Sequence, residues 1–172
     1  MKKLIVILLI SMVAFPSCAQ KKDKDKDEAT STYYLIRHAE KDRSDESNRN
    51  PNLKDEGLQR AENWAKHFED IKFDAVYSTD YNRTKQTAMP TATANNVNLQ
   101  FYNPSNINFE EFLAKTKGQT VLIVGHSNTT PMFTNGLLGE KKYEDMSDDD
   151  NSRLFKVIIA KNKKTSEVSV VE

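Results

Sequence analysis

The sequence Tyr33-Tyr34-Leu35-Ile36-Arg37-His38-Ala39-Glu40 begins with residues that favour a strand and ends beside two side chains that can carry chemistry. Aromatic and branched residues at its start suit a buried pleat. A strand that stops at Arg37-His38 delivers a fixed cation and an imidazole to the rim of a sheet, where open α/β folds bind ligands. Taken alone, such a pair is more often a solvated strand end. The rest of the chain has to decide between these two interpretations.

The length and charge of the chain limit what it can be. A chain of 172 residues has room for one domain with a sizeable core. Its 25 Lys and Arg residues are balanced by 25 Asp and Glu residues, so the formal net charge is zero. The chain has no excess of positive charge that would indicate nucleic acid as a partner. Any anion must therefore be recognised locally, in a pocket.

The N-terminus has the pattern of an export signal. Lys2 and Lys3 precede an apolar run over residues 4–15, which is shorter than the roughly 20 residues that span a bilayer. The run ends at Phe15-Pro16-Ser17-Cys18, which resembles the lipobox of bacterial lipoproteins, although Phe15 and Pro16 depart from the usual residues. We expect residues 1–17 to be a lipoprotein signal peptide. A plain cleaved signal or a retained anchor are the alternatives.

Cys18 is the one cysteine of the chain, so an intrachain disulfide is impossible and a lipid anchor explains it well. No aspartate directly follows it, which by resemblance to lipoprotein sorting signals favours the bacterial outer membrane. Residues 21–27 contain only Lys and Asp and cannot bury anything. We therefore expect residues 18–30 to be a lipidated, charged, flexible tether and residues 31–172 to be the folded domain.

Strand and helix patterns alternate along that domain. We expect strands over 33–36, 73–78, 97–102, 120–124, 154–160 and 168–171. We expect helices over 57–70, from a Thr79 N-cap toward Asn95 with a kink or interruption at Pro90, over 108–117, and over 130–138. Such alternation indicates an α/β fold, a three-layer sandwich whose central sheet is mostly parallel, with an antiparallel hairpin closing the chain.

Three places in this order carry unusual side chains: Arg37-His38 after the first strand, Arg83 in the first turn of a helix, and His126 after the strand over 120–124. Free backbone N–H groups at a helix start already favour anions. Two guanidinium groups and two imidazoles make a site for a tetrahedral dianion. His67 lies off the apolar stripe of its helix and is expected to face solvent.

These residues lie in motifs that resemble the histidine phosphatase superfamily, whose fold is called phosphoglycerate mutase-like. Residues 35–40 resemble its signature with Ala39 in place of glycine, residues 53–57 resemble its helix entry, residues 76–88 its second arginine motif, and residues 124–127 its third motif. The likeness covers roughly Thr32 to the C-terminus. It implies a phosphoglycerate mutase-like three-layer sandwich.

The resemblance also implies a mechanism. His38 would attack phosphorus and become a phosphohistidine, while Arg37 and Arg83 clamp the equatorial oxygens. His126 would donate to a further oxygen or help to orient the group, and Ser44 lies near a phosphate-contacting position of the family. No metal and no cofactor is implied. The expected partner is a small phosphorylated substrate or a phosphohistidine protein.

One part of the family pattern is missing. Members that act on alkyl phosphates carry a general-acid glutamate after the second arginine motif, and neither Glu110 nor Glu111 aligns with it. Glu40, Asp42 and Asp80 are candidates by proximity in sequence, each more often a solvated charge. The main expectation is a metal-independent phosphatase. The alternatives are an envelope phospho-ligand binding protein without turnover and, less favoured because the cap segment is missing, a phosphoglycerate mutase.

Overall fold

The computed structural model describes residues 29–161 and 163–172. The predicted signal peptide, the predicted lipidation site at Cys18 and nearly all of the predicted tether lie outside the described residues. Among the helices described, none combines the length and the apolar composition that crossing a bilayer requires. The elements, in chain order, are β1 (Ser31–Arg37), α2 (Asp55–His67), β2 (Ala75–Ser78), α3 (Asn82–Ala94), β3 (Leu99–Phe101), η1 (Pro104–Asn106), α4 (Phe109–Lys115), β4 (Thr120–Gly125), α5 (Thr129–Leu138), β5 (Arg153–Ala160) and β6 (Lys163–Val170).

The described strands form one six-stranded sheet in the order β3-β2-β4-β1-β5-β6. The first four strands along the chain run parallel, and β5 and β6 add antiparallel pairs at one side. In the parallel register Arg37 lies beside Gly125, and Ser78 lies beside Val124. The ends of β1, β2 and β4 therefore meet at one edge of the sheet, as the sequence predicted.

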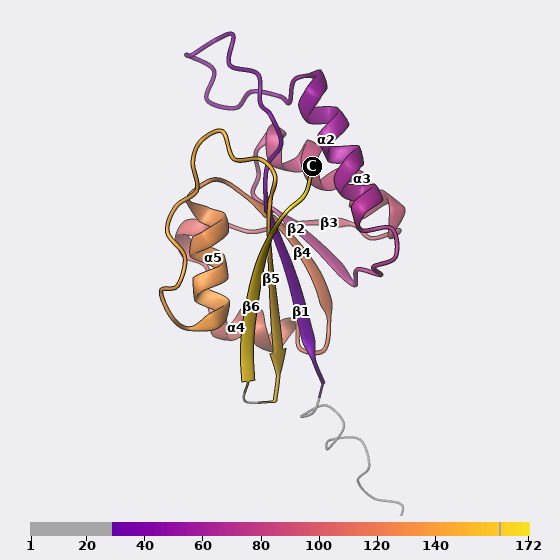
Figure 1. Cartoon of the computed structure of the whole chain (residues 1–172), viewed down its shortest axis with the longest axis vertical. Coiled ribbons are helices and arrows are strands. Elements are labelled where there is room, and N and C mark those ends of the chain that lie inside the picture. The colour runs from indigo at the N-terminus through magenta and orange to yellow at the C-terminus, as the bar shows by residue number, and fades with distance from the viewer. Residues whose placement is uncertain (1–28, 162) are drawn as a thin grey trace, which may run out of the picture.

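Helices cover both faces of the sheet and complete the three-layer α/β fold (Figure 1). The alternation of side chains along β1 explains this arrangement, since successive residues point to opposite faces. Tyr33 and Leu35 pack with Phe112 of α4 and Phe133 of α5. Ile36 packs in the other core, which α2 and α3 cover. The predicted fold class is confirmed.

Several local predictions were wrong. Helix α3 begins after Tyr81 rather than after a Thr79 N-cap, and Pro90 does not interrupt it. Leu58 was predicted on the buried face of its helix but is 43% exposed. Strand β6 begins at Lys163, earlier than the predicted 168, so the paired part of the final hairpin is longer. His67 is exposed, as predicted.

Gly57 allows the N-terminal turn of α2 to lie against the chain that leaves His38. An ideal Cβ at Gly57 would lie 2.2 Å from the carbonyl oxygen of Glu40. Because this oxygen belongs to the backbone, it cannot move away without a cost in free energy. We expect Gly57→Ala to lower the free energy of unfolding by about 1–3 kcal/mol, which outweighs the better helix propensity of alanine. Urea denaturation measures this.

A matched alanine variant separates the clash from a general effect of changing α2. Glu62 is exposed on the same helix, so Glu62→Ala should leave the urea midpoint nearly unchanged. A Gly57→Ala variant as stable as the unmodified protein would contradict the tight approach to Glu40.

Candidate active site

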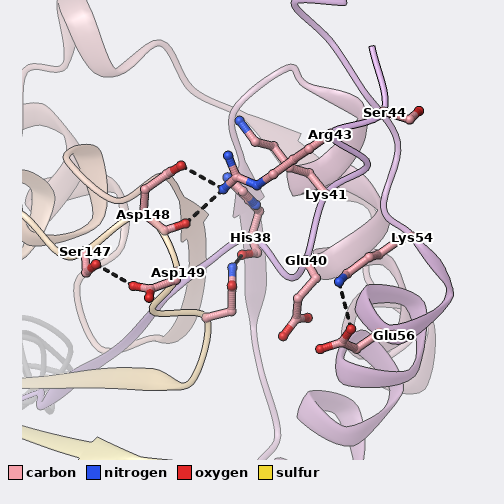
Figure 2. A pocket seen from close by; sticks show the side chains of 11 residues that line it. His38, Glu40, Lys41, Arg43, Ser44, Lys54, Glu56, Ser147, Asp148 and Asp149 are labelled. Atoms are coloured by element: carbon pink, nitrogen blue, oxygen red, sulfur yellow. Dashed lines mark hydrogen bonds and ion pairs between the residues drawn. The ribbon is translucent and has the colours of Figure 1, made fainter. Parts of the chain in front are cut away.

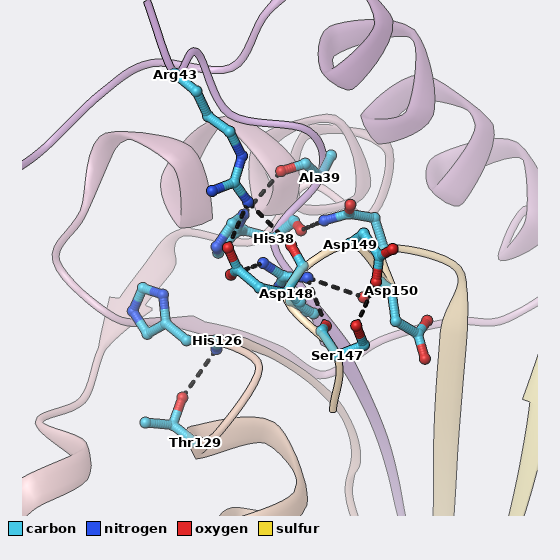
Figure 3. A network of polar contacts seen from close by, with 11 residues as sticks. His38, Ala39, Arg43, His126, Thr129, Ser147, Asp148, Asp149 and Asp150 are labelled. Atoms are coloured by element: carbon cyan, nitrogen blue, oxygen red, sulfur yellow. Dashed lines mark hydrogen bonds and ion pairs between the residues drawn. The ribbon is translucent and has the colours of Figure 1, made fainter. Parts of the chain in front are cut away.

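His38 lies directly after β1, and its backbone is held on both sides. Its N–H donates to the Gly125 carbonyl at 2.9 Å, and its own carbonyl accepts from Asn151 Nδ2 at 2.7 Å. The imidazole Nδ1 lies 2.7 Å from the Ala39 carbonyl oxygen (Figure 3). A carbonyl can only accept, so Nδ1 carries the proton. In the neutral ring Nε2 is therefore left with a free lone pair.

The surroundings of His38 keep the ring neutral. Burial lowers the pKa of His38 to about 3, against the opposing effect of the Ala39 carbonyl. The nearby charges of Arg37, His126 and Arg83 lower it further. A neutral imidazole with a fixed tautomer is the form that can act as a nucleophile.

Arg37 is the last residue of β1, is 1% exposed and lies among loop carbonyls. Its Nη1 donates to the carbonyls of Ser147 and Asp150 at 3.0 and 3.3 Å. Its Nη2 lies 2.7 Å from Oδ1 of Asp148. Within the described part of the chain its Nε is buried and has no hydrogen-bond partner. The sequence predicted a fixed cation here, and the loop over 147–150 holds it in place.

Arg83 is the second residue of α3 and is held loosely. Its guanidinium carbon lies 4.5 Å from the centre of the Tyr81 ring, and Nη1 makes a long 3.4 Å contact with the Arg49 carbonyl. Among the residues described, its buried Nε finds no partner. Both predicted arginines therefore keep a buried N–H without an acceptor, and a bound anion could supply one.

His126 follows β4, and its ring lies edge-on to that of His38, with 5.4 Å between the ring centres. Burial, followed by the charges of Arg83, Arg37 and Lys41, lowers the pKa of His126 to about 4. Its Nε2 lies 2.9 Å from Thr79 Oγ1. The structure thus brings together the four residues that the sequence singled out first.

Threonine hydroxyls orient this group, which the sequence did not predict. The Thr84 hydroxyl donates to backbone carbonyls, and the Thr79 hydroxyl donates to Thr84 at 3.0 Å. The Thr79 oxygen must then accept from Nε2–H of His126, which leaves the lone pair of the neutral ring on Nδ1. Thr87 accepts from the Ala39 N–H at 2.9 Å and donates to the Arg83 carbonyl at 2.7 Å.

A cavity of about 600 Å³ reaches His38 (Figure 2). Every residue that lines it has a polar or charged side chain, and both signs of charge occur: His38, Glu40, Lys41, Arg43, Ser44, Lys54, Glu56, Ser147, Asp148, Asp149 and Asn151. Arg37 is absent from this lining, and its two terminal nitrogens are hydrogen-bonded to the loop over 147–150. Arg83 and His126 also lie outside the lining. The cavity is therefore the space next to His38 in which the rest of a substrate could lie.

Glu40 and Ser44, the two weaker predictions, both line this cavity. Glu40 is tied by Oε1 to Nε of Arg60 at 2.7 Å, and its Oε2 is buried without a partner in the described part of the chain. Ser44 is exposed, and its N–H is bound to the Asp42 carboxylate at 2.9 Å. Neither placement assigns a role.

The sequence missed the residues that surround the predicted four. Asp148 joins Arg37 to Arg43, with 2.7 Å to each guanidinium. The charged stretch over 140–150 was predicted only as a loop, because nothing in its local pattern points to Arg37. No group of three or more His, Cys, Asp or Glu side chains suited to a metal ion occurs in residues 29–161 and 163–172.

The lowered pKa values of the two histidines predict how stability depends on pH. The unfolded chain takes up a proton on each near 6.5, whereas the folded protein does not until about 3 and 4. The free energy of unfolding should therefore fall as the pH drops from 6.5 toward 5, with a slope for His38 alone that approaches about 1.4 kcal/mol per pH unit near pH 5. Urea denaturation at pH 7, 6 and 5 measures this slope.

That pH window lies above the usual titration of Asp and Glu, so carboxylates contribute little to the slope. A His38→Asn variant should show a shallower slope than the unmodified protein between pH 7 and 5. Equal slopes for the two proteins would contradict a buried, neutral His38.

The comparisons with known proteins agree with this fold. Residues 33–103 match the family model of the histidine phosphatase superfamily (branch 1). A phosphoglycerate mutase from Bacillus anthracis has a similar structure, with a TM-score of 0.64 and 15% identity over 85% of this chain and 95% of its own. No functionally curated protein sequence matches the chain.

Two further structures show the same fold. A protein described as a phosphohistidine phosphatase, SixA, from Agrobacterium tumefaciens has a TM-score of 0.59 and 22% identity over 81% of this chain and 97% of its own. A phosphoserine phosphatase from Entamoeba histolytica, in complex with 3-phosphoglyceric acid, has a TM-score of 0.56 and 16% identity over 83% and 97%. At these identities the likeness shows the fold.

Proposed function

We propose that this chain is a member of the histidine phosphatase superfamily, which its family-model match over residues 33–103 and its fold support. We propose further that it hydrolyses phosphate monoesters or phosphohistidine through a covalent phosphohistidine on His38. The observation that carries the proposal is the state of His38. Its Nδ1 is committed to the Ala39 carbonyl, and burial holds its pKa near 3, so Nε2 keeps a free lone pair beside two arginines.

In the first step Nε2 of His38 would attack phosphorus in line with the leaving group. The N–P bond forms as the bond from phosphorus to the leaving atom breaks. The ring gains positive charge as it does so, and Nδ1–H donates to the Ala39 carbonyl throughout. In the second step water would attack phosphorus, the N–P bond would break, and inorganic phosphate would leave.

Arg37 and Arg83 would bind the phosphoryl oxygens and stabilise the charge that spreads over them in the transition state. Their buried, unpartnered Nε groups support this role. His126 would contact a further oxygen through Nδ1, because its Nε2 is bound to Thr79. To donate there, the ring would have to take up a proton, which a bound dianion favours.

The charged cavity supports a substrate whose remainder is polar. Cationic and anionic side chains line it together, so it suits a small phosphorylated metabolite or a phosphorylated protein side chain better than an apolar ester. Structures of similar fold include proteins described as acting on phosphohistidine and phosphoserine.

Turnover of 4-nitrophenyl phosphate by the purified full-length protein, with a chelator present, tests the proposal. We expect hydrolysis that the chelator does not abolish, and a phosphorylated protein when the reaction is quenched. A panel of phosphoesters and phosphohistidine would then rank substrates. No release of 4-nitrophenol would contradict the proposal.

A phospho-ligand binding protein without turnover is the second candidate function. The position of Glu40 favours it, because the carboxylate that the sequence proposed as a possible general acid is tied to Arg60 at 2.7 Å. A protein that only binds would retain phosphate or vanadate without forming a covalent adduct. Trapping of phosphorylated His38 therefore separates the two candidates.

We also propose that the protein is a lipoprotein of the bacterial envelope, anchored by Cys18 in the outer membrane. The support is the pattern of residues 1–20 alone. Labelled palmitate should be incorporated into the unmodified protein and not into Cys18→Ser, and the variant should leave the membrane fraction. Unchanged labelling of Cys18→Ser would contradict the anchor.

A further inference from the structure

The phosphatase proposed above needs a proton donor that the four predicted residues do not provide. An alkoxide is a poor leaving group, so the oxygen that leaves phosphorus has to be protonated as the bond breaks. His38 is the nucleophile and Arg37 is bound to the loop over 147–150, so the donor has to come from elsewhere. The leaving group would lie in the cavity that reaches His38.

Four carboxylates line that cavity: Glu40, Glu56, Asp148 and Asp149. Glu40 is bound to Arg60 and Glu56 to Lys54, at 2.7 and 2.8 Å, so both are held on the α2 side of the cavity. Asp149 accepts from the Ser147 hydroxyl. Of these four, Asp148 is the carboxylate that contacts an arginine expected to hold the phosphoryl group.

Contacts from two segments of the chain hold the Asp148 side chain in position. Its Oδ1 lies 2.7 Å from Arg37 Nη2, and its Oδ2 lies 2.7 Å from Arg43 Nη2. The carbonyls of Ser147 and Asp150 bind the other nitrogen of the Arg37 fork, so the loop itself is fixed relative to the site. A phosphoryl oxygen bound to Arg37 would thus share a guanidinium with Asp148.

We propose that Asp148 is the general acid of the reaction, which rests on the function proposed above. It protonates the leaving oxygen as the phosphoryl group moves to His38, and it accepts a proton from the attacking water in the second step. Its side chain is 65% exposed, so it can exchange protons with solvent between the two steps. This assigns a role to a residue far from every motif that resembles the family.

Protons and charges balance over the two steps. The phosphate monoester dianion, neutral His38 and protonated Asp148 become the free alcohol, the phosphohistidine and ionised Asp148. Water then gives its oxygen to phosphorus and one proton to Asp148, and the products are neutral His38, hydrogen phosphate and protonated Asp148. No other reactant is needed.

Binding of the substrate supplies the protonated form. In the free protein burial raises the pKa of Asp148, but the hydrogen bond from Arg43 and the charges of Arg37 and Arg43 hold it below the usual value. A phosphoryl dianion bound to Arg37 would weaken the attraction between Arg37 and the ionised Asp148 carboxylate. It would also add negative charge next to that carboxylate. Both effects favour uptake of a proton from solvent.

Two esters with different leaving groups test the role of Asp148 in the full-length protein. For Asp148→Asn we expect kcat for serine phosphate to fall by about 10²-fold or more. We expect kcat for 4-nitrophenyl phosphate to change little, because 4-nitrophenolate leaves as a stable anion without a proton. The asparagine keeps the shape of the side chain and can still accept from Arg37.

Asp145→Asn is the matched control, since it removes the same charge from an exposed residue of the charged stretch over 140–150 that does not line the cavity, and it should leave both rates nearly unchanged. An equal fall for both esters would overturn the proposal and assign Asp148 to positioning Arg37. Tighter binding of both esters with unchanged kcat would overturn it too, because Asp148 would then merely compete for Arg37. If the unmodified protein hydrolyses neither ester, the proposed function itself fails and this inference falls with it.

Discussion

Replacement of His38 by alanine should lower the hydrolysis of 4-nitrophenyl phosphate by about 10⁴-fold or more, as the loss of an enzymatic nucleophile does elsewhere. The physical reason is that no other described imidazole is placed as His38 is. His126 lies next to it, but its Nε2 is bound to Thr79. The measurement is kcat at saturating substrate, together with the phosphorylated protein recovered after quenching.

The third histidine provides the control for this experiment. His67 is exposed at the end of α2, where its ring packs beside Trp64 and Phe68. His67→Ala should keep both the rate and the covalent adduct. Hydrolysis that survives in His38→Ala would contradict the nucleophile and with it the proposed mechanism.

Replacement of Arg83 by alanine should lower kcat/KM by about 10²–10³-fold, the usual effect of removing one donor that stabilises charge in a transition state. The fold should tolerate the change, because Arg83 makes only a long contact with Arg49 and a stacking contact with Tyr81. Arg37 is less suitable for this test, since its loss would also release the loop over 147–150. The measurement is kcat/KM combined with the urea midpoint.

Two further variants sharpen the result. Arg83→Lys keeps the charge but loses the planar fork, so its rate should fall between those of the alanine variant and the unmodified protein. Lys85 lies on the same helix and pairs with Asp80 at 2.8 Å on the surface. Lys85→Ala should therefore have no effect on kcat/KM, and a loss as large as that of Arg83→Ala would point to general attraction of anions instead of a specific contact.

Much of the site could be predicted because its main residues follow strands. Continuous apolar runs such as residues 120–124 are recognisable from their composition. Parallel strands bring their carboxyl ends to one edge, so residues after different strands become neighbours. Arg37, His38 and His126 follow this rule, and Arg83 adds the start of the next helix.

The failed predictions concern contacts that bring distant segments together. Thr79 has the residue type of an N-cap, but its hydroxyl instead lies between Thr84 and His126. Pro90 is expected to break a helix at a cost of about 3 kcal/mol. It does not break α3, because Thr87, Ala88, Thr91 and Ala92 on both sides of it are buried against the protein. Packing of that kind outweighs local propensity.

The sequence by itself determined the α/β fold, the order of its elements and the four residues of the candidate site, because these depend on local periodicity and on the rule that parallel strands end together. The tertiary structure alone decided which carboxylate reaches that site. Asp148 lies 111 positions from Arg37, in a charged stretch without periodicity. Its contact exists because β5 pairs antiparallel with β1, which brings the loop before β5 onto the Arg37 side chain. The proposed nucleophile could thus be predicted from the sequence, whereas the proposed acid could be identified only from the fold.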